Sequence, residues 1–307
     1  MVDGALSRRR MLVTGAAAAA GLVSAACSAA QGSSPAQGTS ARTSASAAAG
    51  AGATTSAAPA SAAGGVRLAP RQYPINPALP AAVAAAHAGQ RPGGWGMDLP
   101  GILTSIPADS KQMALTFDAC GGPDNNELNE ELLNFLMSQE IPATLFLNKR
   151  WIEADPVRAS RLAANPLFEL GNHGTRHCPL SVNGRAAYGI SGTGSAQEAV
   201  DEVWANHEVL TRLVGRPPRF FRTGTAHYDD VGVAIVRDLG ERPVGFSINA
   251  DAGATYSAAQ VQQAMSEAKP GVISIAHMHR PKSGTAPGMI AMLPKLRAQG
   301  FQFVKLP

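Results

Sequence analysis

From residue 111 onward, short apolar runs alternate with stretches of helical periodicity. There are seven such runs, MALTFD, ATLFLN, FELGNH, FFRTG, PVGFSIN, GVISIAH and FQFVKL. Strands and helices repeated in this order predict parallel strands joined by crossover helices. Seven strands, with no GxGxxG after the first, favour a closed or nearly closed (β/α)7 barrel over an open doubly wound sheet.

The clearest helix is predicted for residues 196–214. Ser195 and Glu198 have the spacing of a capping box at its start. An apolar stripe then recurs at helical spacing, so we expect one face of this helix to pack against the core. The members of the stripe are Val200, Val203, Trp204, Leu210 and Leu213.

The first 65 residues differ in composition and lie outside the predicted barrel. Residues 1–27 hold three consecutive arginines followed by an Ala-rich apolar run, which is typical of an export signal and too short to span a bilayer comfortably. Residues 28–65 are almost entirely Ala, Ser, Gly, Thr and Pro, so we expect a flexible linker. The rest divides into an N-terminal extension, 66–110, and a barrel domain, 111–307.

The signal carries two further features. Its SRRRML stretch is similar to a twin-arginine signal, the class that exports folded proteins. Its final segment, VSAAC, resembles a lipoprotein cleavage box with Cys27 as the lipidated residue. Ser24 stands where such boxes usually carry Leu or Val, so ordinary cleavage near Ala26 is the alternative. We expect an exported protein, either a lipoprotein at the outer face of the cell membrane or one secreted to the cell wall.

The charge of the chain excludes two classes of partner. The formal net charge is +4, but removal of residues 1–26 leaves 23 basic and 21 acidic residues. This balance offers no polybasic surface for nucleic acid or for a membrane. We therefore expect membrane contact only through a lipid anchor at Cys27.

Polar side chains stand at the carboxyl ends of most predicted strands. They are Asp118, Asn148, His173, Arg222, Asn249 with Asp251, and His277. In a β/α barrel this edge carries the active site, because the βα loops open there while the helices cover the sides. Each residue alone could be a helix cap, a surface charge or a packed histidine. Together they predict a catalytic pocket.

The segment NHGTRHCPLS carries His173 and His177, four positions apart, just after a strand. Two imidazoles at this spacing can bind one divalent ion if the turn between them curls, and imidazole is a common ligand of zinc. An HxxxH motif is weak alone, but with a strand-end Asp it predicts a metal site. Among the other histidines, His207 lies on the apolar stripe and is expected to be packed, while His227 and His279 fit either role.

The order of these motifs resembles the NodB-type polysaccharide deacetylases, metal-dependent esterases of N-acetylated glycans. The shared pattern is TFD, then HxxxH with a following PLS, then FR, an Asp, and IxH near the C-terminus, and it covers about residues 111–307. The resemblance implies a catalytic domain with a distorted (β/α)7 barrel, a polysaccharide substrate and a divalent metal, zinc being expected. His173 and His177 match the metal ligands of the family.

The resemblance also implies a role for each remaining polar residue. Asp118 matches the catalytic base, and Arg222 matches the residue that orients this base. His277 matches the acid that protonates the departing sugar amine, and Asp251 matches the residue that tunes it. A carboxylate close to an imidazole raises the pKa of the imidazole, as an acid requires.

The first motif departs from the family directly after the base. Ala119 stands where a second Asp normally completes the metal site, and a methyl group cannot bind a metal. We expect Asp118 itself to become the third ligand, because two histidines and one carboxylate leave the open position of a catalytic zinc site. Alternatively another donor fills in, the candidates being Asn148, Asp124 and His279. In the third case the metal is lost.

The leading function hypothesis is an exported metal-dependent deacetylase of a cell-envelope polysaccharide, with peptidoglycan as the substrate suggested by location alone. The alternative is a glycan-binding pseudoenzyme that keeps the barrel groove without turnover. A further hypothesis is a closed zinc site of structural type, which would leave no position for water. Its four ligands would be Cys120, Cys178, His173 and His177.

Cys120 and Cys178 are an even pair in a protein expected to reach an oxidising compartment. Cys120 lies two residues after Asp118, and Cys178 directly follows His177. If Asp118 and the histidines bind one metal, the loops carrying both cysteines converge, and we expect a disulfide between them. The alternative is two buried free thiols.

Overall fold

A computed structural model describes residues 75–307 of the chain. The predicted export signal, the lipidation site at Cys27 and the linker 28–65 lie outside the described residues. Each run predicted as a strand contains one in the structure. The strands of the main sheet are β2 (Gln112–Ala119), β3 (Ala143–Leu147), β4 (Phe168–Asn172), β5 (Phe220–Phe221), β7 (Arg242–Pro243), β8 (Ile248–Asn249), β9 (Ile273–His277) and β10 (Gln302–Val304).

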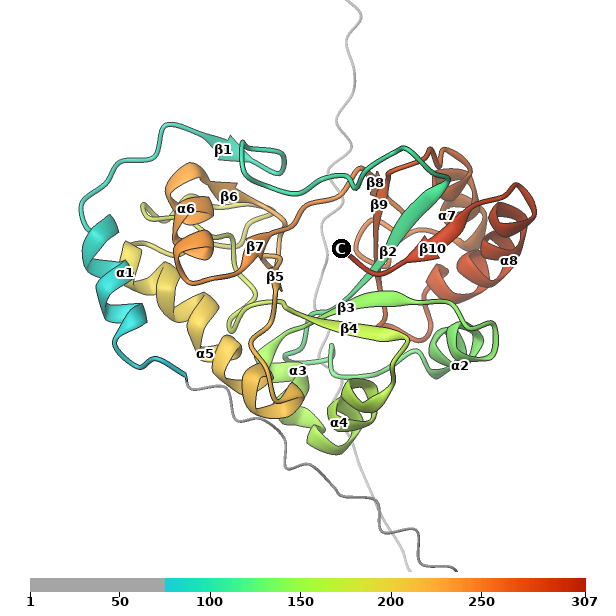
Figure 1. The fold of residues 1–307 in the computed structure, drawn as a ribbon, viewed down its shortest axis with the longest axis horizontal. Helices are drawn as coiled ribbons and strands as arrows, with labels where there is room; N and C mark the ends of the chain where they lie inside the picture. The colour runs from blue at the N-terminus through green and yellow to red at the C-terminus, as the bar shows by residue number, and fades with distance from the viewer. Residues whose placement is uncertain (1–74) are drawn as a thin grey trace, which may run out of the picture. The chain divides into compact units, whose positions relative to one another are not determined.

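All pairs in this sheet are parallel, in the order β7-β5-β4-β3-β2-β9-β8, with β10 beside the start of β2. The run PVGFSIN holds both β7 and β8 and reaches both edges. The Val244 amide donates to the Phe221 carbonyl of β5, and further along the Ser247 amide donates to the Ile273 carbonyl of β9. The sheet is therefore curled into a distorted β/α barrel with its helices outside (Figure 1). The predicted fold class is confirmed.

The helices connect successive strands and cover the outside of the sheet. They are α1 (Leu79–His87), α2 (Glu130–Ser138), α3 (Lys149–Ala154), α4 (Pro156–Ala164), α5 (Ala196–Val214), α6 (Asp230–Asp238), α7 (Ala258–Ser266) and α8 (Thr285–Ala298). Helix α5 has the predicted bounds, and the Ser195 hydroxyl accepts from the Glu198 amide. The Glu198 carboxylate accepts from the Gly194 amide instead of the Ser195 amide. Only one of the two hydrogen bonds of the predicted capping box is therefore present.

Side chains along β2 alternate between two environments, as a strand requires. Phe117 and Ala119 belong to the large apolar cluster between the sheet and the helices. Ala114 and Asp118 point the other way, into the barrel. The interior is filled at its amino-terminal end by a second apolar cluster, built from Ile106, Ala114, Phe146, Phe220, Val244, Ile273 and Leu306. Asp118 therefore stands above a closed apolar floor.

The segment before the barrel contributes elements that the sequence analysis did not predict. Strand β1 (Trp95–Gly96) pairs antiparallel with β6 (Tyr228–Asp229), and α1 packs against α5 and α6. The His87 ring bonds Asp238 of α6 at 2.8 Å. Two-residue strands leave no periodic pattern, which explains why they were missed. None of the helices in residues 75–307 has the length and apolar character needed to cross a bilayer.

Candidate active site

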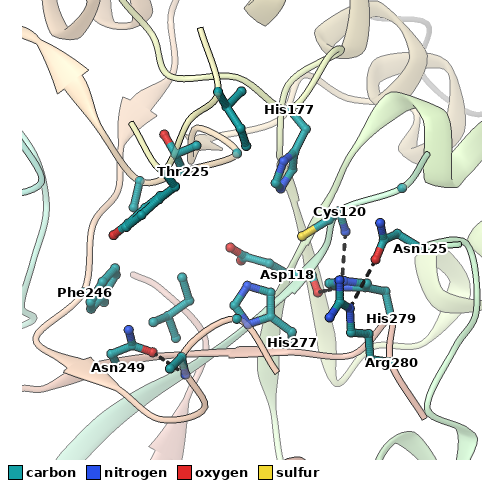
Figure 2. Close-up of a pocket in the computed structure, with 18 of the residues that line it drawn as sticks. Asp118, Cys120, Asn125, His177, Thr225, Phe246, Asn249, His277, His279 and Arg280 are labelled. Carbon is teal, nitrogen blue, oxygen red and sulfur yellow. Dashed lines mark hydrogen bonds between the residues drawn. The ribbon is translucent and has the colours of Figure 1, made fainter. Parts of the chain in front are cut away.

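The carboxyl ends of the barrel strands surround a pocket of about 620 Å³. Among the predicted residues, Asp118, His177, Asn249 and His277 line it directly. Figure 2 shows Asp118, His177 and His277 converging on the same space from different segments of the chain. His173, Arg222 and Asp251 lie behind this lining and contact it. The structure thus brings the predicted strand-end residues together.

Asp118 forms a buried ion pair with Arg222, which directly follows β5. Arg222 Nη1 donates to Asp118 Oδ1 at 2.8 Å and to the Thr116 hydroxyl at 2.8 Å. Arg222 Nη2 donates to the Gly245 carbonyl, also at 2.8 Å. Both charged groups are buried, and the guanidinium carbon lies 4.3 Å from the centroid of the Phe146 ring. These contacts fix the orientation of the Asp118 carboxylate.

His277 and Asp251 form a second charged pair. His277 Nδ1 lies 2.7 Å from Asp251 Oδ1, and the His277 amide donates to Oδ2 at 2.7 Å. The Thr285 hydroxyl at the start of α8 donates to the same Oδ2 at 2.8 Å. Burial lowers the pKa of His277, but the charge and hydrogen bond of Asp251 outweigh it, so this pKa lies well above its usual value. The pair therefore favours a protonated His277.

The turn after β4 carries His173 and His177. His173 Nδ1 donates to the Arg222 carbonyl at 2.9 Å, so in the neutral ring Nε2 holds the lone pair. His177 has a left-handed backbone, with φ of 65°. Glu202 of α5 supports this backbone, because its Oε1 accepts from three successive amides that end at His177, each at 3.0 Å. The centroids of the two imidazole rings lie 5.0 Å apart, and the rings meet edge to face.

Cys120, His173 and His177 each offer a donor atom, and the three atoms lie within 4.8 Å of one another. His177 Nε2 is buried and has no hydrogen-bond partner among residues 75–307. Imidazole nitrogen and thiolate sulfur are ligands that zinc-like ions prefer, and three of them leave an open position. The residues present therefore fit a divalent metal. The group holds Cys120 in the place where the sequence analysis expected Asp118.

The sequence profile of the polysaccharide deacetylase family matches residues 105–244, a segment that holds Asp118, both motif histidines and Arg222 and ends before His277. Residues 105–244 of the chain are therefore similar to the polysaccharide deacetylase family. Enzymes of this family are hydrolases of non-peptide carbon–nitrogen bonds in N-acetyl groups. No curated protein matches the sequence significantly.

Solved structures of deacetylases share this fold. A CE4 family pseudoenzyme from Bacillus anthracis is 22% identical, with a TM-score of 0.58, covering 67% of this chain and 68% of that one. The Bc1960 peptidoglycan N-acetylglucosamine deacetylase is 24% identical, with a TM-score of 0.57, covering 67% of this chain and 91% of that one. PdaA of Bacillus subtilis, a family 4 carbohydrate esterase, is 19% identical, with a TM-score of 0.54, covering 67% and 82%.

The arrangement of the two described cysteines differs from the expectation. Cys120 and Cys178 are both free and buried, so the predicted disulfide is wrong. Cys120 faces the histidines, whereas Cys178 turns toward Glu202, and burial together with this carboxylate raises the pKa of the Cys178 thiol to about 12. Cys178 is also absent from the group of donors within 4.8 Å, so the closed four-ligand zinc site is not formed in the described part of the chain.

The other candidate replacements for the second Asp are engaged or remote. The Asn148 amide donates to two carbonyls of the histidine turn, and its oxygen caps α3. His279 Nδ1 lies 3.3 Å from the Asp118 carbonyl, and Asp124 is exposed. His207 is packed as expected, with Nδ1 2.8 Å from a Glu241 carboxylate oxygen.

Two residues of the candidate site escaped the sequence analysis. Cys120 was considered only as half of a disulfide or as a ligand of a closed site. The signal that could have found it is strand alternation, since continuing the alternation of β2 by one residue places Cys120 on the same side as Asp118. Glu202 was missed although it is an acid on the buried face of α5, beside Val203. A buried carboxylate that accepts hydrogen bonds from the backbone of the HxxxH segment helps to position the metal-ligating histidines.

Proposed function

We propose that this chain is an exported, metal-dependent deacetylase that hydrolyses N-acetyl groups of a cell-envelope polysaccharide, with peptidoglycan as the leading substrate. The observation that carries the proposal is the pairing of Asp118 and His277. They are direct partners in the parallel register of β2 and β9, and both line the pocket. Each is bonded to a residue of opposite charge, Asp118 to Arg222 and His277 to Asp251.

These pairings support an acid–base mechanism for amide hydrolysis. Asp118, held by Arg222, accepts the proton of the attacking water. His277, kept protonated by Asp251, donates a proton to the departing sugar amine, so acetate and a free amino sugar are released. A divalent ion held by His173, His177 and Cys120 would supply Lewis acidity to the acetyl carbonyl and the water.

The substrate and the location are proposed on separate grounds. A structure with the same fold is named a peptidoglycan N-acetylglucosamine deacetylase. The export signal in residues 1–27 directs the protein toward the cell envelope, where Cys27 anchors it through a lipid. Cell fractionation tests the anchor, because Cys27→Ser should move the protein from the membrane to the medium.

Acetate release from acetylated chito-oligomers and from peptidoglycan tests the proposed reaction. We expect Asp118→Asn and His277→Ala each to reduce the rate by at least about 100-fold, the scale of a lost base or acid. His87→Ala is the matched control, because this histidine pairs with Asp238 outside the pocket. Near-full activity in either site variant would reject the role assigned to that residue.

A second candidate function is glycan binding without turnover. The observation that favours it is Ala119 in place of the second Asp, together with a pseudoenzyme among the similar structures. This candidate predicts that the protein binds acetylated glycan and releases no acetate even when it is loaded with metal. Measuring both quantities on the same preparation decides between the two candidates.

A further inference from the structure

Cys120 is the first residue after β2, and it lines the pocket that Ala119 does not reach. Side chains alternate along the strand, so Cys120 points to the same side as Asp118. Ala119 is fully buried on the opposite side, in the apolar cluster with Phe117 and Leu147. A third metal-ligating side chain is therefore available one position later in the sequence than the family pattern places it. Figure 2 shows the Cys120 sulfur beside Asp118, between His177 and His277.

We propose that Cys120 is the third metal ligand of this protein, and that the site is a thiolate site with ligands His173, His177 and Cys120. This inference deepens the proposed function and rests on its requirement for a metal. The sulfur lies 3.8 Å from His173 Nε2. Zinc bonds of about 2.3 Å to sulfur and 2.0 Å to nitrogen, at a tetrahedral angle, need about 3.5 Å between these atoms. The observed separation is close to this requirement.

His177 supplies an independent observation. Its Nε2 is buried and lacks a hydrogen-bond partner in the described residues, while its backbone is held by Glu202. A buried polar atom without a partner is costly. A ring nitrogen of His177 lies within 4.8 Å of both the Cys120 sulfur and a His173 ring nitrogen. A metal bound by all three residues satisfies this nitrogen.

Asp118 is the competing third ligand, since its Oδ2 lies 3.6 Å from His173 Nε2. Its other oxygen pairs with Arg222, which is 0% exposed. Asp118 does not belong to the group of described residues whose donor atoms all lie within 4.8 Å of one another, whereas Cys120 does. The Cys120 sulfur, unlike the Asp118 carboxylate, forms no ion pair with Arg222. Asp118 therefore stays with Arg222 as the base, and the sulfur acts as the ligand.

A sulfur ligand changes which metal the site prefers. Thiolates favour zinc and similar borderline ions, whereas carboxylates suit magnesium, calcium and manganese. We therefore expect zinc and cobalt(II) to bind tightly and magnesium and manganese to bind weakly. Cys120→Asp, which exchanges sulfur for oxygen at the same position, should narrow the difference in affinity between zinc and manganese.

Cobalt(II) titration of the purified chain tests the ligand directly, because a cobalt–thiolate bond gives an intense near-ultraviolet charge-transfer absorption. We expect this absorption in the parent protein and its loss in Cys120→Ser, with a drop in cobalt affinity of at least about tenfold. Cys178→Ser is the matched control, since it removes the other buried thiol, and should keep both signals. Retention of the absorption in Cys120→Ser, or bound cobalt without it in the parent, would overturn the inference.

A second measurement needs no variant and covers the case in which Cys120→Ser fails to fold. Zinc should protect Cys120 of the parent from alkylation by iodoacetamide, as read by peptide mass mapping. Equal alkylation of Cys120 with and without zinc would also overturn the inference. The outcome for catalysis is separate. Thiolate absorption without acetate release rejects the deacetylase proposal alone, and acetate release without the absorption rejects the ligand alone.

Discussion

Replacing Asp251 by Asn tests the acid role of His277. Asn preserves the size of the side chain but removes the negative charge 2.7 Å from His277 Nδ1. A hydrogen bond to a charged group contributes about 1.5–3 kcal/mol, and about 1.4 kcal/mol corresponds to one pKa unit. The pKa of His277 should therefore fall, because the burial that already lowers it is no longer offset by the charge of Asp251.

The sign of the pH effect follows from the role of His277 as an acid. The imidazole must be protonated, so activity is lost as the pH rises through the pKa of His277. In Asp251→Asn the basic limb of the kcat profile should therefore move to lower pH. At a pH above the shifted limb the rate should fall about 10- to 100-fold, and the difference should shrink toward lower pH.

The assay is the release of free amine from acetylated chito-oligomers, measured across the pH range in which both proteins stay folded. Thr285→Val is the matched control, because it removes a hydrogen bond to Asp251 but keeps the charge. We expect the control to leave the basic limb in place. Coincident basic limbs in the parent and in Asp251→Asn would refute the reasoning, since Asp251 would then not govern the proton on His277.

Three other substitutions test the packing around the site. Arg222→Met leaves the buried Asp118 carboxylate without its partner, and should lower the free energy of unfolding by about 3–5 kcal/mol in urea titrations. Gly224→Ala places a Cβ 2.5 Å from the His177 ring, so it should weaken cobalt binding without touching a ligand atom. Ala119→Asp buries a carboxylate among apolar side chains, and should destabilise the fold by at least about 2 kcal/mol without raising metal affinity, which urea and cobalt titrations measure.

The sequence alone predicts the barrel well, because buried parallel strands are continuous apolar runs that are easy to recognise. The sequence also predicts that the strand-end residues lie at one edge of the barrel, because the carboxyl ends of its parallel strands share an edge. These residues are Asp118, His173, Arg222 and His277. Sequence analysis cannot assign the run PVGFSIN to both sheet edges, since that depends on the curl of the whole sheet.

The pairing of Cys120 was mispredicted for a different reason. Convergence of two loops is necessary for a disulfide, but the direction of each side chain decides whether it forms. Cys120 follows the inward face of β2, whereas Cys178 points toward Glu202 of α5. The period-two alternation of β2 was available in the sequence. The direction of Cys178 was not, because it follows the left-handed turn at His177.

The segment ACGG, residues 119–122, acts as a structural unit at the end of β2. Ala119 fills the outer apolar cluster, and Cys120 turns back into the pocket. The chain must then leave the strand at once, and Gly121 allows this with φ of 66°. A Cβ at Gly121 would lie 2.5 Å from the Trp151 backbone nitrogen, so no other residue fits without displacing α3. The glycine turn thus holds the sulfur at the level of the two histidines, while the carboxylate before it remains paired with Arg222.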